Sequence, residues 1–331
     1  MFDLPSAELH LHIEGTLEPE LIFDLAARNG VDLPYAGLQD LKDRYEFTDL
    51  QSFLDLYYSN MQVLRTEADF ADMTRAYLRR AAAAGVRHAE IMMDPQAHLV
   101  RGVALETCVN GVASALADSE AEFGISTGLI AAFLRDRPAE EALEVLEALL
   151  AMDAPIIGIG LDSAEVGHPP SGFTAVYERA RQAGLRRIAH AGEEGPPEYV
   201  REALDLLGVE RIDHGIRCLE DDALVRRLVV EQVPLTVCPL SNVRLRAVDT
   251  LKDHPLPAML ERGLNVCVNS DDPAYFGGYV DDNFRQLEQT FGFSADQLAT
   301  LAANSIRSSF IDGGRRDALL AEVAEWRSAQ R

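Results

Sequence analysis

The stretch "ELHLHIEG", residues 8–15, places two histidines one residue apart in an apolar run near the start of the chain. Side chains alternate along an extended strand, so His10 and His12 point to one face while the leucines beside them point to the other. Two imidazoles on one face can bind a metal ion, and they can equally be polar residues near the end of a strand. The pair alone therefore leaves the function open.

Apolar runs of similar length recur along the chain, and each ends in a cluster of polar residues. The predicted strands cover residues 7–13, 86–93, 125–133, 155–161, 187–191, 211–215, 234–238 and 265–269. Sequences rich in helix formers lie between several of them, at residues 139–152, 173–183 and 221–231. Eight strands alternating with helices predict an α/β fold, a TIM-like (β/α)8 barrel, with an open doubly wound sheet as the structural alternative.

The interval between the first and second predicted strands is unusually long. Residues 18–84 contain several helical stretches, and Gly30 and Gly85 stand where helices commonly end. We expect one barrel domain over residues 1–331 with this helical insertion after the first strand. Such an insertion beside the mouth of a barrel can form a lid, and it can also serve packing alone.

The composition narrows the class of protein. Thirty basic and 54 acidic side chains give a net charge of −24, which disfavours nucleic acid as a partner because phosphate groups are repelled. No run reaches the ~18 uncharged apolar residues of a membrane span. Asp3 and Glu8 stand where a signal peptide would need basic and apolar residues. We therefore expect a cytoplasmic protein that does not bind membranes.

The cysteines are widely spaced and include no C-x-x-C pair: Cys108, Cys218, Cys238 and Cys267. This spacing indicates small buried residues in a reducing compartment. It also argues against the nucleobase deaminases that hold zinc through a P-C-x-x-C element.

Four histidines end predicted strands: His10, His12, His190 and His214. The carboxyl ends of barrel strands carry the active site, so we expect these side chains to meet there. The three imidazoles from the first and fifth strands, together with Asp271 from the eighth, make a His₃Asp set suited to zinc or another divalent ion. Such an ion can lower the pKa of a water toward neutrality.

Further acidic groups lie beside this set. Glu193 in "HAGEE" is within reach of a substrate as a proton donor, and His214 and Asp272 can orient and deprotonate the attacking water. The pattern predicts metal-assisted hydrolysis. Competing interpretations are a helix-capping turn at "SDDP" and a solvated loop at "HAGEEG". "GIGLDS", residues 158–163, resembles the start of a dinucleotide-binding motif but lacks its third glycine, so a dinucleotide-binding site is disfavoured.

In family order, the motifs "ELHLHIEGTLEPE", "HAGEE", "RIDHGIRCLED", "TVCPLSNVRL" and "VNSDDPAYFGGY" resemble the adenosine/adenine deaminase family of the amidohydrolase superfamily. The resemblance covers nearly the whole chain. It implies a (β/α)8 barrel with one divalent metal per chain, usually zinc, with Fe²⁺ or Mn²⁺ also compatible with the ligands. It also implies hydrolytic loss of ammonia from C6 of a purine, and it leaves both a monomer and a homodimer open.

The resemblance assigns a role to each matching position. The implied metal ligands are His10, His12, His190 and Asp271. Glu193 would protonate purine N1, and His214 would take or position the proton of the attacking water. Asp272 would hydrogen-bond purine N7, Ser163 stands where the family supplies a backbone N–H to N3, and Glu165 belongs to the same substrate-binding loop.

Several positions indicate the adenine branch of the family. Adenosine enzymes typically read His-x-His-Leu-Asp-Gly, whereas this chain has Glu14 at the Asp position and Ser163 where glycine is typical. Tyr275 and Phe276 add bulk just past the site. We expect Glu14 and these aromatic residues to fill the space of a ribose, so that adenine is converted to hypoxanthine and ammonia.

Adenosine and adenines substituted at N6, of the cytokinin type, are the alternative substrates. The residues disfavour two other functions. A non-catalytic purine-binding barrel would be expected to lose part of the metal or acid set, and here every position is filled. A two-metal hydrolase would often use a carbamylated lysine, but Lys42 and Lys252 do not end predicted strands.

Overall fold

The computed structural model describes residues 3–330 and shows eight parallel strands whose order in the sheet follows the chain. The strands are β1 (Ser6–Glu8), β2 (Val86–Met93), β3 (Ser126–Leu134), β4 (Ile156–Asp162), β5 (Arg186–Ala191), β6 (Arg211–His214), β7 (Pro234–Val237) and β8 (Asn265–Val268). Strands buried on both faces read as continuous apolar runs, which is why the sequence revealed them. The prediction of a TIM-like (β/α)8 barrel is confirmed.

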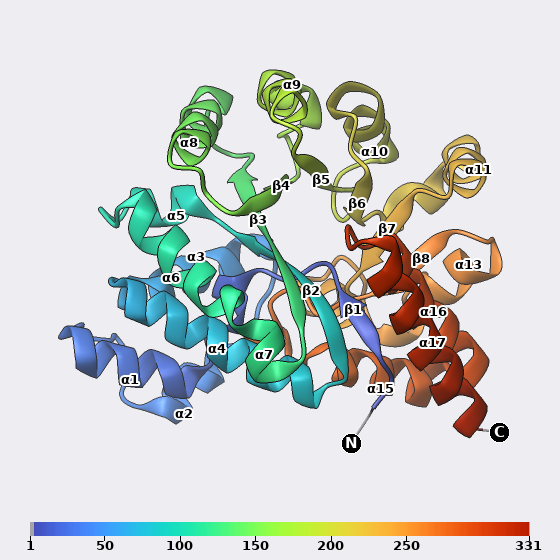
Figure 1. The fold of residues 1–331 in the computed structure, drawn as a ribbon, viewed down its shortest axis with the longest axis horizontal. Helices are drawn as coiled ribbons and strands as arrows, with labels where there is room; N and C mark the ends of the chain where they lie inside the picture. The colour runs from blue at the N-terminus through green and yellow to red at the C-terminus, as the bar shows by residue number, and fades with distance from the viewer. Residues whose placement is uncertain (1–2, 331) are drawn as a thin grey trace.

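Helices lie outside the strands and alternate with them along the chain (Figure 1). After β2 they are α5 (Pro95–Leu99), α6 (Leu105–Ala117), α7 (Ser119–Phe123), α8 (Ala139–Ala151), α9 (Thr174–Gln182), α10 (Pro197–Glu202), α11 (Asp222–Glu231), α12 (Pro239–Arg244), α13 (Leu256–Glu261), α14 (Pro273–Phe276), α15 (Val280–Phe291), α16 (Ala295–Ser308) and α17 (Gly313–Ala329). Within residues 3–330, none of the helices combines the length and the apolar character that crossing a membrane requires.

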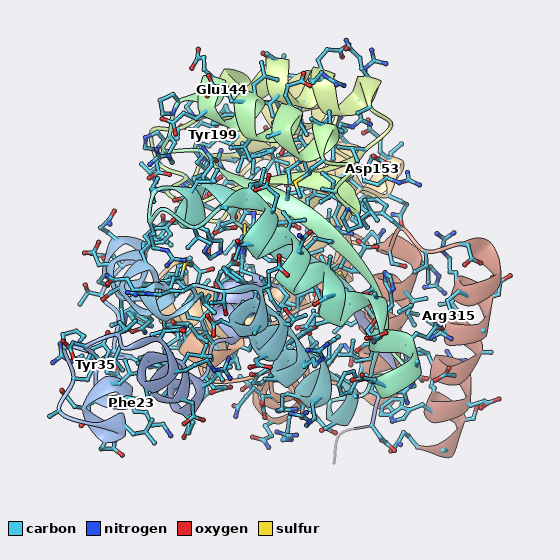
Figure 2. All side chains as sticks on the ribbon, turned by 60° about the vertical axis from the view of Figure 1, so that its left-hand side comes forward. Phe23, Tyr35, Glu144, Asp153, Tyr199 and Arg315 are labelled. Atoms are coloured by element: carbon cyan, nitrogen blue, oxygen red, sulfur yellow. The ribbon has the colours of Figure 1, made fainter. Side chains whose placement is uncertain are left out.

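The predicted insertion between β1 and β2 is confirmed and contains α1 (Pro19–Asn29), α2 (Leu38–Asp43), α3 (Leu50–Asn60) and α4 (Glu67–Ala83). Proline at the first position of α1 and Gly30 in the left-handed region after it account for its two ends. Figure 1 shows α1, α2 and α4 on the side of the barrel away from α16 and α17. Figure 2 places Phe23 of α1 and Tyr35, just before α2, at the outer edge of this group.

The first and last strands meet beyond the ends of their regular ladders. The main-chain N–H of Asp271 donates to the carbonyl of His10 over 3.0 Å, and that of His12 donates to the carbonyl of Asp271 over 3.1 Å. These bonds make an isolated parallel bridge between Leu11 and Asp271. The first strand was predicted over residues 7–13, but its regular ladder with β2 ends at Glu8, and beyond it the chain makes only isolated bridges, Leu11 with Asp271 and His12 with Met92 of β2. Three of the four candidate metal ligands therefore border this junction, which is called the β1–β8 seam below.

The interior of the barrel contains a buried ion pair. Arg211 of β6 donates to Glu90 of β2 over 2.5 Å and to the carbonyl of Leu9 over 3.0 Å, and both charged side chains are fully buried. Burial alone would raise the pKa of Glu90, but Arg211 and then His88 outweigh it and lower that pKa to about 2. The pair therefore stays ionised across the physiological range.

Replacing Glu90 by Gln should lower the free energy of unfolding by about 3–5 kcal/mol, because buried Arg211 would lose its closest counter-charge and keep only Asp213, 3.8 Å from its Nε atom. Urea denaturation measures the loss. Glu210→Gln is the control, since its pair with Arg186 is partly exposed and is worth at most ~1 kcal/mol. The folded-state pKa of Glu90 lies below its unfolded value, so its contribution is complete above about pH 5 and is lost as the pH falls toward 2. Equal losses in the two variants would contradict this account.

Candidate active site

The polar side chains predicted at the strand ends meet at one end of the barrel and are buried there. His10 and His12 follow β1, His190 lies in β5, His214 ends β6, and Asp271 follows β8. Each of them is at most 7% exposed. The structure thus brings together residues that are up to 261 positions apart in the sequence, as the β1–β8 seam requires.

The predicted ligand atoms lie close together. One atom each of His10, His190, His214 and Asp271 all lie within 4.8 Å of one another, and His12 joins this group through His190 and Asp271. The Nε2 atom of His190 lies 3.1 Å from that of His10 and 3.3 Å from that of His12. The Oδ1 atom of Asp271 lies 3.4 Å from Nε2 of His10 and 3.6 Å from Nε2 of His12. Tetrahedral zinc with bonds of about 2.0–2.1 Å would separate its ligand atoms by roughly 3.3–3.4 Å.

The other nitrogen of each imidazole faces an oxygen atom. The Nδ1 contacts are 3.1 Å from His10 to the carbonyl of Thr236, 3.4 Å from His12 to Asp162, and 3.6 Å from His190 to Asp213. A carbonyl only accepts, so Nδ1 of His10 carries the proton and its Nε2 presents a lone pair to the cluster. Oxygen atoms behind metal-binding imidazoles commonly fix the ring and its tautomer in this way. The donor set therefore fits a divalent ion.

The pKa values of His190, His214 and Asp271 are shifted toward the forms that bind a cation. That of His12 is not: burial would lower it, but the contact with Asp94 and the charges of the nearby aspartates outweigh burial and raise the pKa of His12 well above its usual range. Burial, followed by the neighbouring imidazole of His10, lowers the pKa values of His190 and His214 well below the usual range. Burial opposes ionisation of Asp271, but the surrounding imidazoles outweigh it and lower its pKa well below the usual range. Ser241 also donates to Oδ2 of Asp271 over 2.6 Å. Neutral imidazoles beside an ionised carboxylate are the forms that bind a cation.

Glu193 and His214 lie next to each other at the cluster. Oε2 of Glu193 is 3.3 Å from Nε2 of His214, which is 3.7 Å from Oδ2 of Asp271. The side-chain amide of Asn242 donates to Oε1 of Glu193 over 3.1 Å and lies 3.2 Å from Nδ1 of His214. Burial and then the charge of Asp271 raise the pKa of Glu193 well above its usual value. A carboxyl group that keeps its proton near neutral pH can act as a general acid.

Asp272 follows Asp271 directly, and its pKa is shifted in the opposite direction. Burial and the charge of Asp271 raise the pKa of Asp272 well above its usual value. A Cβ atom on Gly15 would come within 2.0 Å of Oδ1 of Asp272, so the main chain at residue 15 must be glycine for the carboxyl group to lie there. The two adjacent acids are thus held in different protonation states.

Three of the predicted site residues have left-handed main-chain conformations without being glycine. The φ angles are 70° at Ser163, 64° at His214 and 67° at Asp271. Such angles are uncommon for residues with a side chain and concentrate at functional sites. Each of the three stands at or just after the end of a strand, where the chain turns away from the barrel.

Glu165 was predicted to belong to the substrate-binding loop, and its carboxylate is occupied by main-chain groups. It accepts hydrogen bonds of 2.6–3.0 Å from the N–H groups of residues 192–195. A Cβ on Gly195 would lie 2.5 Å from Oε1 of Glu165, so this loop can close around the carboxylate only with glycine there. Glu165 therefore sets the conformation of the loop that carries Glu193.

Glu14 was predicted to contact the substrate, and it lies outside the residues that line the site cavity. The side chain is fully buried, accepts a hydrogen bond of 2.7 Å from Nε2 of His98, and faces the N–H of Asp94 at 3.2 Å. His98 in turn contacts Arg101 over 2.6 Å. The structure therefore connects Glu14 to α5 rather than to the candidate catalytic groups.

Helix α3 of the insertion covers the site. The cavity above the metal-ligand cluster is lined on this side by Leu50, Phe53, Leu54, Tyr57 and Tyr58. Tyr275 and Phe276 do not line it. Phe276 packs on Phe53 with ring centroids 4.6 Å apart, and Tyr275 contacts Tyr57 at 5.6 Å. Tyr275 and Phe276 therefore pack against the aromatic side chains of α3 that line the cavity, on the side away from it.

Sequence reasoning placed Ser241 and Asn242 at the end of a predicted strand without assigning them a role, and it missed Thr236 and Asp213, which also contact predicted site residues. Ser241 and Asn242 contact Asp271, Glu193 and His214, as described above. The motif "PLSN" carried the signal, since polar residues directly follow an apolar strand. Thr236 and Asp213 remained unnoticed, because each sits inside a strand where sequence gives no direction for the side chain.

Fold and site together define a class of protein, a (β/α)8 barrel with a buried His/Asp cluster suited to a metal ion at the carboxyl ends of its strands. Residues 5–326 match the family model described as adenosine deaminase. The chain therefore belongs to the adenosine deaminase family, and the resemblance seen in its motifs is confirmed.

Individual relatives agree with this membership. The chain is 63% identical over 329 residues to adenine deaminase of Streptomyces coelicolor, covering 99% of this chain and 97% of that protein. It is 74% identical to adenine deaminase from Arthrobacter aurescens, whose crystal structure superimposes with a TM-score of 0.97 over 97% of this chain and 98% of that one. An amidohydrolase from Burkholderia ambifaria, solved with bound Zn, is 29% identical, with a TM-score of 0.91 over 99% and 92% of the two chains.

Proposed function

We propose that the protein hydrolyses adenine to hypoxanthine and ammonia, using one divalent ion, Zn²⁺, held by His10, His12, His190 and Asp271. One observation carries the proposal: four ligand-type atoms lie 3.1–3.6 Å from their neighbours beside a cavity that acidic groups of raised pKa also line. The relatives described as adenine deaminases support adenine as the substrate, and the relative with bound Zn supports the metal.

The reaction replaces the C6–N bond of the base by a C6–O bond. The ion, when bound, lowers the pKa of water so that hydroxide is available near neutral pH. His214 takes the proton of the attacking water, since its imidazole is neutral and its Nε2 lies 3.7 Å from Oδ2 of Asp271. The same proton then leaves with the amine as ammonia. The second proton of the water is released when the C6–O bond becomes a carbonyl, and it restores the carboxyl group of Glu193, whose own proton stays on N1 of hypoxanthine.

Glu193 acts as the general acid toward the purine ring. Its protonated carboxyl group donates to N1, which draws electrons away from C6 and makes that carbon electrophilic. Asp272 donates to N7, and its raised pKa supports this role because N7 has no proton of its own to give. Asn242 and Glu165 keep Glu193 in place, the first through the carboxyl group and the second through the loop.

A turnover assay tests the proposal with adenine, adenosine and N6-methyladenine side by side. We expect kcat/KM for adenine to exceed that for adenosine by at least about 100-fold, because a site complementary to one edge of a ligand discriminates strongly. The metal content should be close to one ion per chain. Faster turnover of adenosine or of N6-methyladenine would overturn the assignment to adenine.

A further inference from the structure

Two buried carboxylates in the site cavity have no role in the mechanism above. Asp94 follows β2 and Asp162 ends β4, and they are 3% and 2% exposed. Both line the same cavity as Glu193 and Asp272. The two strands are not adjacent in the sheet, so the carboxylates approach the cavity from separate directions.

These two side chains carry oxygens without a donor. Burial and then the charge of Asp94 raise the pKa of Asp162 well above its usual value, so the pair can share one proton and still accept a hydrogen bond from a ligand. Within residues 3–330, no hydrogen-bond partner exists for Oδ1 of Asp94 or for either carboxylate oxygen of Asp162. The imidazole of His12 faces both, with Nδ1 at 3.7 Å from Oδ1 of Asp94 and 3.4 Å from Oδ2 of Asp162. Buried oxygens without donors are strongly disfavoured, so a ligand that brings an N–H group would satisfy them.

A second metal ion is the competing occupant, because His12, Asp94 and Asp162 form a cluster of ligand-type atoms. The histidine argues against it. Its Nε2 already faces His190 and Asp271, and a neutral imidazole has only one lone pair. Nδ1 of His12 therefore carries a proton and acts as a donor toward the two carboxylates. The group that completes this pocket is a donor as well.

Free purine bases offer such a donor where nucleosides do not. The imidazole ring of adenine carries one N–H, and in a nucleoside the glycosidic bond replaces it. We propose that Asp94 and Asp162 accept the imidazole N–H of a free purine base and thereby exclude purines substituted at N9. This inference rests on the proposed deamination of adenine and adds the residues that set its preference for the free base.

The test compares adenine with 9-methyladenine in the metal-loaded protein. We expect the wild type to prefer adenine by at least about 100-fold in kcat/KM, because a site built for an N–H group rejects a ligand that lacks it. Asp162→Asn and Asp94→Asn should each lower kcat/KM for adenine by about 10- to 100-fold and leave that for 9-methyladenine unchanged or higher. The ratio between the two substrates should therefore fall by about 10-fold or more.

Asp136→Asn is the matched control, since Asp136 follows β3, is exposed, and lies outside the cavity lining. Its ratio should equal that of the wild type. Asn and Asp have the same size, so steric exclusion of the methyl group alone predicts an unchanged ratio in all three variants. That outcome would overturn the proposal. Nearly two ions per chain in the wild type, falling to one in Asp162→Asn, would show a second cation instead.

A binding measurement distinguishes failure of this inference from failure of the proposed function. Calorimetry with hypoxanthine and 9-methylhypoxanthine needs no turnover and requires no variant to fold. Tighter binding of hypoxanthine by the wild type, lost in Asp162→Asn, supports the inference even if adenine proves not to be the substrate. Equal binding of the two ligands to the wild type refutes it even if adenine is deaminated.

Discussion

Glu193→Gln is expected to lower kcat for adenine by about 10²–10⁴-fold while the metal content stays at the wild-type level. Glutamine keeps the size of the side chain and the hydrogen bond from Asn242 can be retained by its carbonyl oxygen, but no ionisable proton remains for N1. Without that proton, the C6 carbon stays a weak electrophile. Steady-state kinetics and metal analysis on the same preparation measure both quantities.

Glu194→Gln is the control for this variant. Glu194 is the next residue of the same loop, is only partly buried, and does not line the cavity. We expect nearly normal turnover. Full activity of Glu193→Gln would show that the raised pKa of Glu193 has no catalytic use, and loss of metal in the same variant would place this residue in the ligand set instead.

His10→Ala should reduce the affinity for metal by more than the ~10- to 100-fold typical of losing a residue that only contacts a ligand. The structure gives the reason, since Nε2 of His10 lies within 3.1–3.4 Å of His190 and Asp271, and removing it leaves three donors for the ion. The metal content after dialysis should fall well below one ion per chain, and turnover should fall with it.

His168→Ala provides the comparison for His10→Ala. His168 is a histidine of the same chain that contacts the carbonyl of Ala164 and lies outside the cluster. Its replacement should leave the metal content unchanged. Retention of a full complement of metal by His10→Ala would show that the four proposed ligands are not the set that binds the ion.

The strands of the barrel were predictable because each is buried on both faces and therefore apolar throughout. Val86–Met93 was predicted with the bounds that the structure shows, and most other strands shift by only a residue or two. The first strand is the exception. Its predicted end at residue 13 includes His10 and His12, whose main chain pairs across the β1–β8 seam, and pairing with a segment about 260 residues away leaves no local pattern.

The candidate ligands were predictable for a related reason, since polar residues at the ends of apolar strands must gather at one end of a barrel. The hydrogen-bond partners of individual carboxylate side chains were not predictable. Glu14 and Glu165 stand beside site residues in the sequence, yet one is bonded to His98 and the other to the N–H groups of its neighbouring loop. These partners lie 84 and 28 positions away, and sequence spacing does not reveal them.

The β1–β8 seam gives the protein an order of assembly. Its two sides are the earliest and the latest strands that the ribosome delivers, so a nascent chain holds both histidines of "HLH" long before Asp271 exists to face them. Metal capture can then be complete only after the last strand docks. A chain that binds the ion would therefore have a closed barrel. An unfinished or truncated chain that lacks the last strand would bind no ion and would have no hydrolytic activity.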